Sequence, residues 1–340
     1  VGSEMCIRDS RNTLQQAYRI RVAEQETDLV NGRKLIWDTG RVESGQSLYI
    51  EYRGPALESG KRYYWQVRIW DNQGSASQWS EPAFWEMGLL SPEEWQADWI
   101  HADWEEAPEK SQPSPYLRAE FELPGPVKRA RAYVTSMGLY AMELNGVPVG
   151  DRLFTPGWTS YAKRLQYQTY DVTALLHEGR NAVGAILGDG WYRGNLGFQG
   201  QRNVYGKKLA LLLQIRIELA DGSTRVVSSN ESWKASTGPI RMSDIYNGEH
   251  YDARLEMPGW SKPGFDDTGW SRVVEADYPK DHLVAPAGPP VRRIEEVSPT
   301  RILKTLQGDT VFDMGQNMAG WALSLIHISE PTRPLYISYA

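Results

Sequence analysis

The sequence has almost no cysteine, and its one cysteine, Cys6, lies close to the first residue. A chain with one thiol can form no internal disulfide and has no thiolate set to hold a metal ion. No apolar run is long enough to span a membrane. The formal net charge is −6 and basic residues nowhere cluster. Binding to nucleic acid or to a membrane is therefore not expected.

The two ends of the sequence are related to each other. Residues 1–10 (VGSEMCIRDS) and 323–332 (LSLIHISEPT) can be encoded by the two strands of one DNA segment. An inverted repeat that flanks an insert resembles a transposon-type sequencing adapter translated by mistake. We therefore interpret 1–10 and 323–340 as non-native and leave them out of the fold prediction. The native part, about 11–322, is expected to be an internal fragment, so a missing signal peptide is uninformative.

Alternation of polar and apolar side chains is the main structural signal, and convincing long amphipathic helices are scarce. AYRIRVAE (17–24) and RYYWQVRIWD (62–71) have the two-residue period of half-buried strands. In the second run one face carries Tyr63, Trp65, Val67 and Ile69, and the turn sequence DNQG ends it. Short strands with regular turns predict a small β-sandwich over 11–88.

A second β-domain is predicted over 115–285. Asn145-Gly146 and Asp221-Gly222 are strong hairpin signals. In LLLQIRIEL (211–219), Leu213 and its alternate neighbours are expected to face inward, and Gln214, Arg216 and Glu218 outward. Between the domains, 89–114 is rich in proline, acidic residues and tryptophan, which indicates a linker packed against its neighbours. Residues 286–322 are too few to bury a core alone and are interpreted as the truncated start of a third β-domain.

Catalytic motifs are missing from this part of the chain. There is no phosphate-binding glycine loop with Lys-Ser/Thr, no GxSxG and no HExxH. The four histidines of 11–322 stand far apart, without the spacing of metal ligands. Asp266-Asp267, in FDDTGW, are typical of turn and capping residues rather than of an acid/base pair. No catalytic residue and no cofactor is assigned, and a metal site stays unknown.

Two loops combine glycine with aromatic, acidic and amide side chains. They are LGDGWYRGNLGFQGQRNVYG (187–206) and IYNGEHYDAR (245–254). Glycine lets the backbone approach a ligand closely, amides and carboxylates can bond to hydroxyl groups, and rings can stack on sugars. The alternative is a long ordered loop whose polar groups satisfy its own backbone. The candidate sugar-binding or domain-docking residues are Asp189, Trp191, Tyr192, Asn203, Tyr205, Asn247, Glu249, Tyr251 and Asp252. We expect both loops at one edge of the second sandwich, with Trp191 exposed if that edge is a docking surface.

These motifs carry a resemblance. The run from MELNGVPVG through GDGWYRG (142–194), with YNGEHYDAR and WSKPGFDDTGW (260–270), resembles the N-terminal sandwich of bacterial α-L-rhamnosidases, glycoside hydrolase family 78. Residues 17–88 resemble the fibronectin type III-like domain at the front of many glycoside hydrolases, and VFDMGQNMAGW (311–321) the start of the family's next β-domain. The resemblance implies an all-β chain: a fibronectin type III-like sandwich, a jelly-roll sandwich and the truncated start of a third β-domain.

The resemblance also implies a function for the longer protein. In the family an (α/α)₆ barrel hydrolyses terminal α-L-rhamnosides with inversion, using one carboxyl group as acid and a second as base. Neither has a counterpart here, so the fragment is expected to be inactive. Implied partners are rhamnose-containing glycans and the missing barrel. Some relatives bind rhamnose with calcium on a sandwich module, but no residue here can be matched to that site. The compartment stays open between bacterial cytoplasm, periplasm and secretion.

Two other functions are compatible with the sequence. The chain could be the front of another exo-glycosidase, such as a β-galactosidase-like protein, although the long GDGWYRG and YNGEHYDAR motifs argue against this. It could also belong to a non-enzymatic carbohydrate-binding or adhesion protein built only of sandwiches. The uncut gene would distinguish them, because helical repeats with paired acidic residues after Trp321 would indicate an enzyme and further short strands a binding protein.

Overall fold

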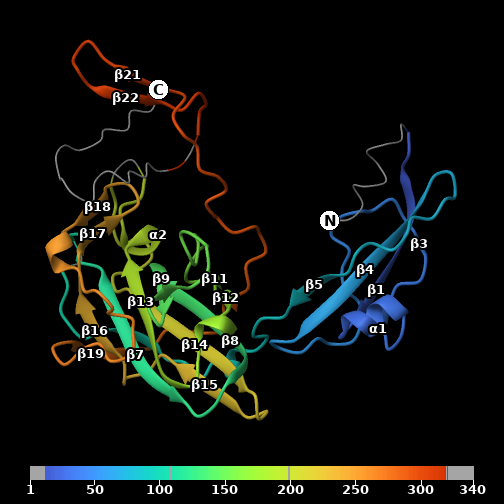
Figure 1. Cartoon of the computed structure of the whole chain (residues 1–340), viewed down its shortest axis with the longest axis horizontal. Helices are drawn as coiled ribbons and strands as arrows, with labels where there is room; N and C mark the ends of the chain where they lie inside the picture. The colour runs from blue at the N-terminus through green and yellow to red at the C-terminus, as the bar shows by residue number, and fades with distance from the viewer. Residues whose placement is uncertain (1–11, 108, 198–199, 319, 321–340) are drawn as a thin grey trace. The chain divides into compact units, whose positions relative to one another are not determined.

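The computed structural model describes residues 12–107, 109–197, 200–318 and 320. The segments interpreted as non-native, 1–10 and 323–340, lie outside the described residues. The chain divides into two units, one ending at Val291 and the other beginning at Arg292. Strands dominate the fold, as predicted (Figure 1). No helix in the described ranges has the length and apolar character needed to cross a membrane.

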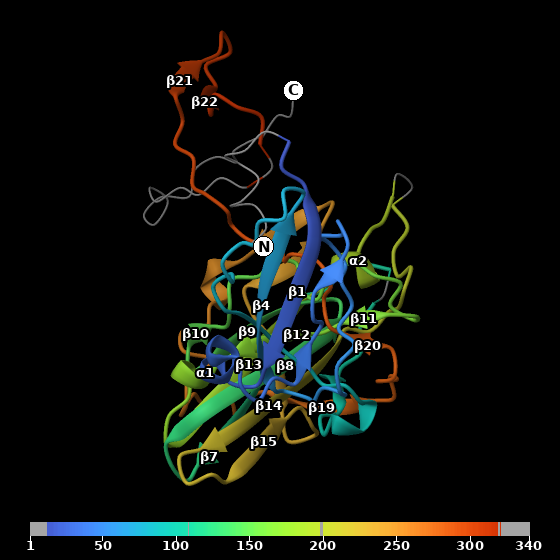
Figure 2. The same cartoon turned by 90° about the vertical axis from the view of Figure 1, so that its right-hand side faces the viewer.

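The first β-domain is built on one five-stranded sheet, in which β2, β1, β4 and β5 follow one another and β3 also pairs with β1. Its elements are β1 (Gln15–Ala23), α1 (Glu26–Asn31), β2 (Trp37–Asp38), β3 (Val42–Glu43), β4 (Arg62–Asp71) and β5 (Ala83–Glu86). The long antiparallel strands β1 and β4 lie side by side (Figure 2), with Ile20 opposite Val67. A left-handed Gly32 ends α1, and its N–H donates to carbonyl groups of the last turn.

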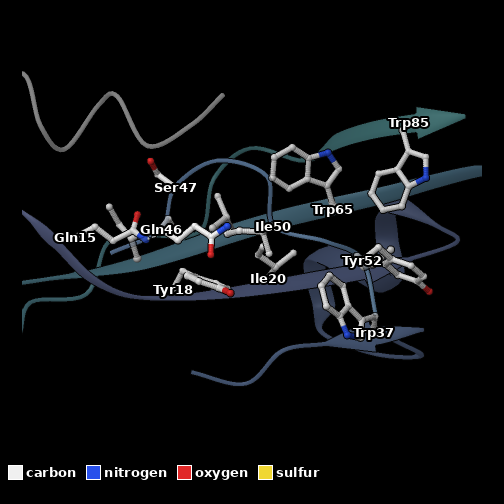
Figure 3. A pocket seen from close by; sticks show the side chains of 13 residues that line it. Gln15, Tyr18, Ile20, Trp37, Gln46, Ser47, Ile50, Tyr52, Trp65 and Trp85 are labelled. Atoms are coloured by element: carbon white, nitrogen blue, oxygen red, sulfur yellow. Dashed lines mark hydrogen bonds between the residues drawn. The ribbon is translucent and has the colours of Figure 1, made fainter. Parts of the chain in front are cut away.

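The inner face of this sheet is only partly covered. A cavity of about 450 Å³ lies between it and the segment 46–52 (Figure 3). The predicted alternation is confirmed, because Tyr18, Ile20 and Val22 of β1 and Trp65, Val67 and Ile69 of β4 all line the cavity. Trp37, Tyr52 and Trp85 close one end, where Tyr52 meets both tryptophans edge-on. The first domain therefore has an apolar core that is not fully packed.

The second β-domain is built on an eleven-stranded sheet with strand order β10-β9-β13-β7-β16-β19-β6-β14-β8-β12, and β15 also pairs with β14. These strands are β6 (Trp99–Ala102), β7 (Pro115–Leu123), β8 (Val127–Met137), β9 (Leu139–Leu144), β10 (Val147–Pro148), β12 (Gln168–Asp171), β13 (Gly179–Gly188), β14 (Ala210–Leu219), β15 (Thr224–Ser228), β16 (Lys234–Thr237) and β19 (Ser271–Ala276). The smaller elements are η2 (Pro92–Glu94), β11 (Leu165–Gln166), η3 (Thr173–Leu175), α2 (Gly190–Arg193), β17 (Ile240–Asp244), β18 (Gly248–Tyr251), η4 (Ala253–Leu255) and β20 (Leu283–Val284).

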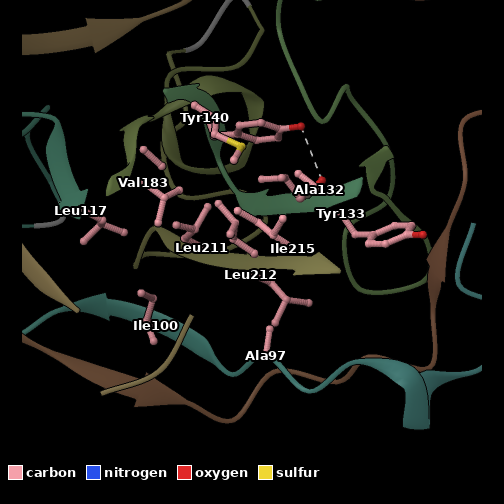
Figure 4. Close-up of a cluster of buried hydrophobic side chains, with 14 of the residues drawn as sticks. Ala97, Ile100, Leu117, Ala132, Tyr133, Tyr140, Val183, Leu211, Leu212 and Ile215 are labelled. Atoms are coloured by element: carbon pink, nitrogen blue, oxygen red, sulfur yellow. Dashed lines mark hydrogen bonds between the residues drawn. The ribbon is translucent and has the colours of Figure 1, made fainter. Parts of the chain in front are cut away.

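The core of the second domain lies between the two halves of this sheet. Side chains of β7 and β13, such as Leu117 and Val183, meet those of β14, such as Leu211 and Ile215 (Figure 4). All four are fully buried. Asn145 and Gly146 have positive φ angles of 52° and 81°, as the predicted hairpin requires. The pattern of apolar residues and the turn signals therefore predicted these inward faces and this hairpin correctly.

The outer face of β14 differs from the prediction. Gln214, expected to be exposed, has 0% exposure. Its amide donates to the Glu94 carbonyl over 3.0 Å, and its side-chain oxygen accepts from the Gln96 N–H over 2.6 Å. The segment 89–114, predicted to be a linker, thus covers this face, and its strand β6 pairs with β14 and β19. A two-residue period identifies the face of a strand but not what packs on it.

The second unit contains one described hairpin, β21 (Arg301–Lys304) and β22 (Thr310–Asp313). Arg301 forms an ion pair with Asp313 across the hairpin. Most of its side chains are exposed, including Ile302, Val311 and Phe312. A lone two-stranded hairpin is at best marginally stable in water. Its assignment to a truncated third domain stays a prediction.

Candidate functional site

The loop 187–206 folds back over the short helix α2. Gly190 has a φ of +52°, and a Cβ at this position would lie 2.6 Å from Leu139 Cγ, so only glycine fits. The Asn203 N–H donates to the Arg193 carbonyl over 3.1 Å, and the Tyr205 N–H to the Tyr192 carbonyl over 3.3 Å. The predicted residues Trp191, Tyr192, Asn203 and Tyr205 are therefore brought together by the backbone of one loop.

Asp189 lies beneath this loop with 2% exposure. One carboxylate oxygen accepts from Arg193 Nε over 2.8 Å. The other accepts from Arg202 Nη2 over 2.8 Å and from the Ser111 hydroxyl over 2.9 Å. Arg193, itself 1% exposed, also donates to Glu106 over 2.6 Å. Both oxygens of Asp189 are thus engaged inside the protein.

Arg202 joins the two predicted loops. Besides Asp189, its guanidinium group contacts Asp244 over 3.2 Å. Asp244 accepts from the Asn195 N–H over 2.8 Å, and from the N–H groups of Tyr246 and Asn247 over 2.9 and 3.0 Å. The turn between β17 and β18 is therefore fastened to the loop 187–206. A buried network of this kind specifies one arrangement, because each charge needs its partner.

Aromatic rings cover the outside of this network. Trp191 is half-buried and stacks on Trp158 at a centroid distance of 5.8 Å and an angle of 5°. Phe154 lies 6.0 Å from Trp191, and the Trp158 indole N–H donates to the Tyr205 hydroxyl over 3.0 Å. We call Phe154, Trp158, Trp191 and Tyr205 the aromatic edge. Phe154 and Trp158 are 51% and 54% exposed. Trp191, expected to be exposed if this edge docks a partner, is instead partly covered by Trp158.

Tyr192 points away from this edge into the core and is 3% exposed. Its ring meets Tyr161 at 5.1 Å, and a Cβ on Gly206 would lie 2.0 Å from its hydroxyl. Gly206 therefore has to be glycine for the ring to fit. Burial and a hydrogen bond with Tyr278 raise the pKa of Tyr192 far above its ordinary value. In this position the side chain stabilises the loop and cannot reach a ligand.

The remaining predicted residues lie along β18 and beyond it. Asn247 and Glu249 are exposed, and the exposed Tyr251 donates to Glu256 over 2.9 Å. Asp252 caps η4, accepting from Arg254, whose guanidinium group lowers the pKa of Asp252 to about 2. The contacts that join the two loops run through Asp244, Tyr246 and Asn247. Glu249, Tyr251 and Asp252 make none of them.

The site contains residues that the sequence did not single out. Arg202, Asp244 and Glu106 complete the buried network, and Phe154 and Trp158 form its exposed cover. The sequence signal for the cover was LFTPGWTS (153–160), in which two large rings stand in a turn-rich stretch. Among the described residues, no three His, Cys, Asp or Glu side chains converge as metal ligands. Asp189, Asp244 and Glu106 each face arginine, so they do not fit a calcium site.

Comparisons with known proteins find a match for each of the two β-domains. A family model described as the α-L-rhamnosidase N-terminal domain matches residues 125–295. A model for the Rha78A-like N-terminal immunoglobulin domain matches residues 5–91. An α-L-rhamnosidase of Alteromonas sp. (strain LOR) is 38% identical over 92% of this chain and 35% of its own length. One from Formosa agariphila is 33% identical over 93% of this chain and 35% of its own length.

Comparison with solved structures gives the same family. The native α-L-rhamnosidase of Aspergillus terreus superposes with a TM-score of 0.81 at 39% identity, over 92% of this chain and 36% of that one. The Streptomyces avermitilis α-L-rhamnosidase complexed with L-rhamnose does so with a TM-score of 0.79 at 28% identity, over 91% of this chain and 46% of that one. The chain thus spans about a third of the length of the two curated relatives from Alteromonas and Formosa.

Proposed function

The chain belongs to the α-L-rhamnosidase N-terminal domain family, and from this premise we propose that it is the accessory front part of an α-L-rhamnosidase. The longer protein would hydrolyse terminal α-L-rhamnosides with inversion. The observation that carries this proposal is that the match to α-L-rhamnosidases runs through both β-domains. The reaction itself would take place in a part of the enzyme outside this chain.

The ion pairs of the candidate site support the proposal that this fragment has no hydrolytic activity. Inverting hydrolysis needs two carboxyl groups about 6.5–9.5 Å apart that face the sugar. Asp189, Asp244 and Glu106 are instead engaged with arginine, and Asp189 is buried. Glu249 is exposed and takes part in no ion pair of the described residues. A carboxylate whose oxygens all accept from arginine or backbone groups has little capacity to act as a general acid or base.

An assay of the purified 340-residue chain tests this proposal. With an aryl α-L-rhamnoside we expect no turnover above the buffer rate, while an intact α-L-rhamnosidase serves as the positive control. Glu249→Gln provides the decisive variant, because Glu249 is exposed and its replacement leaves the buried network intact. Turnover that survives repurification and disappears in Glu249→Gln would place an active site on this chain.

We further propose that the aromatic edge docks against the remainder of the enzyme, in the family its catalytic barrel. Phe154 has a φ of 56°, a conformation that costs a bulky L-residue energy, yet its ring is 51% exposed. A strained backbone that presents an apolar ring is typical of a functional surface rather than of packing. Contact with rhamnose in a glycan is the alternative, but Asp189 and Tyr192 cannot offer it hydrogen bonds because they are buried.

Trp158→Asp tests docking directly. The chain would be co-expressed with the remainder of its own gene, recovered from the uncut reading frame, and the complex captured through a tag. We expect Trp158→Asp to reduce capture at least tenfold and the control Tyr49→Asp, an exposed ring of the first domain, to leave it unchanged. Rhamnose should not alter the tryptophan fluorescence of the unmodified chain. A saturable change in the millimolar range, lost in Trp158→Asp, would favour sugar contact instead.

A further inference from the structure

On the outer face of the first domain, opposite the cavity, three arginine side chains lie close together. Arg19 of β1 lies directly opposite Arg68 of β4, and Arg21 lies opposite Gln66 in the same register. We call Arg19, Arg21 and Arg68 the arginine face. Like charges placed directly opposite each other on neighbouring strands destabilise a sheet. A neighbouring ring and Asp38 offset this repulsion only in part.

A tryptophan orients two of these arginines. The Ser77 and Ser80 hydroxyl groups accept from the backbone N–H groups of Ile69 and Val67, each over 3.1 Å. These contacts fix the segment 77–80 along β4, so that Trp79 reaches over the outer face. The guanidinium carbons lie 4.1 Å (Arg21) and 4.8 Å (Arg68) from the centre of the Trp79 ring. Stacking on a ring holds a guanidinium group in one plane and leaves its edge free to donate.

The charge of the arginine face is not balanced by the protein. Asp38 accepts from Arg19 over 2.8 and 2.6 Å and lies 3.7 Å from Arg21. Within the described residues, no carboxylate lies within 4.0 Å of the Arg68 guanidinium group. Three positive charges thus face one negative charge. Burial, followed by the repulsion of Arg19, lowers the pKa of Arg21. The hydrogen bond to Asp38 raises the pKa of Arg19. A bound anion would therefore chiefly supply the counter-charge that is missing beside Arg68 in the described part of the chain.

We propose that the arginine face binds a carboxylate group of an acidic saccharide. Planar guanidinium groups on a fixed plane match the two oxygens of a carboxylate, and all three arginines are partly exposed. A nucleic acid is excluded by the net charge of −6. The proposal rests on the proposed function, since a glycan substrate is what an accessory domain of a glycosidase would hold.

The test consists of four titrations of the full 340-residue chain or its variants, all at constant ionic strength. Tetragalacturonate is titrated into the unmodified chain, Arg68→Gln and the control Arg53→Gln, an exposed arginine of the same domain. Binding is followed by calorimetry and by tryptophan fluorescence. The fourth titration replaces the acidic ligand with a neutral tetrasaccharide of glucose. We expect a dissociation constant in the range of about 0.1–1 mM. Arg68→Gln should weaken it about tenfold, and Arg53→Gln should not change it.

Several results would overturn the proposal. Equal binding of the neutral tetrasaccharide would remove the role of charge. Inorganic sulfate is titrated in a separate fifth run, and equal saturation by it would leave a non-specific anion site. A purely structural arginine would show itself differently: Arg68→Gln would lower the melting temperature and leave the titration unchanged. Because binding is measured on the isolated chain, this test can succeed or fail independently of whether the longer protein hydrolyses rhamnosides.

Discussion

The two β-domains of the first unit hold their arginine side chains in opposite ways. In the second domain Arg118 and Arg193 are each 1% exposed and enclosed by oxygen atoms. Arg118 donates to the carbonyl groups of Trp260 and Lys262 and pairs with Glu120 and Asp267. In the first domain Arg21 and Arg68 instead lie against Trp79, with too few carboxylates nearby. The enclosed arginines thus organise the fold, whereas the stacked ones stay available to a ligand.

The two domains also differ in how tightly their apolar cores are packed. The first domain leaves a cavity of about 450 Å³ along its inner sheet face, while Leu117, Val183 and Leu211 in the core of the second have 0% exposure. Close packing fixes side chains, and incomplete packing leaves them room to adjust. The second domain is therefore expected to respond strongly to small changes, and the first only weakly.

The largest difference should come from replacing one arginine in each domain by glutamine. Arg118→Gln leaves Glu120 and Asp267 without their buried partner, and we expect it to lower the free energy of unfolding by about 3–5 kcal/mol. Arg68→Gln should change it by less than about 1 kcal/mol, because it removes a ring contact but also a repulsion. Urea unfolding followed by circular dichroism measures both. Equal losses would show that the two kinds of arginine do not differ.

A change of one methyl or methylene group should give the next largest contrast. A Cβ on Gly184 of β13 would lie 2.3 Å from the Trp260 ring, so Gly184→Ala is expected to cost about 1–3 kcal/mol. Val67→Ile extends a side chain into the cavity of the first domain and should stabilise it by up to about 0.8 kcal/mol. Thermal unfolding of the two variants provides the comparison. If Val67→Ile destabilised the protein, the first domain would be as tightly packed as the second.

The smallest expected effect concerns pH. Burial alone would raise the pKa of Glu120, but Arg118 and Arg180 outweigh it and lower the pKa below its ordinary value of 4.5. Since the unfolded chain then binds the proton more readily, the stabilisation is complete above pH 4.5 and is lost as the pH falls through the folded-state pKa. We expect Glu120→Gln to reduce the loss of stability between pH 6 and pH 3 by up to about 1 kcal/mol.

Asp38→Asn is the matched variant in the first domain. The hydrogen bond from Arg19 lowers the pKa of Asp38, so its stabilisation has the same sign and is also lost in acid. We expect a smaller change than for Glu120→Gln, because the arginine partner of Asp38 is 35% exposed and that of Glu120 is 1% exposed. Urea midpoints measured at both pH values decide the order. The reverse order would contradict the contrast between enclosed and open arginines.

Much of the candidate site could be predicted because glycine-rich loops with rings and carboxylates stand out in a sequence of alternating strands. Trp191 and Tyr205 do lie together beside Trp158. Asn247 lies in the turn whose Asp244 is paired with Arg202. The sequence could not show that Asp189 is buried, because its partner Ser111 is 78 positions away and Arg202 reaches it only after the loop has folded back. Trp158 was missed for a similar reason. A ring in a turn-rich stretch looks the same whether it is packed or exposed.

The amino-acid sequence by itself determined the strands, their inward faces and the hairpin turns, because period-two alternation and positive-φ residues are local properties. Only the tertiary structure decided which outward-facing residues meet solvent. Gln214 is covered by residues 118 and 120 positions away, and Arg118 finds Asp267 149 positions along the chain. The alternation gives Arg68 and Arg118 the same polar character. What surrounds each guanidinium group depends on which distant segments fold over its strand. For this reason Arg118 is enclosed within the fold, whereas Arg68 lies on the outer face of its sheet.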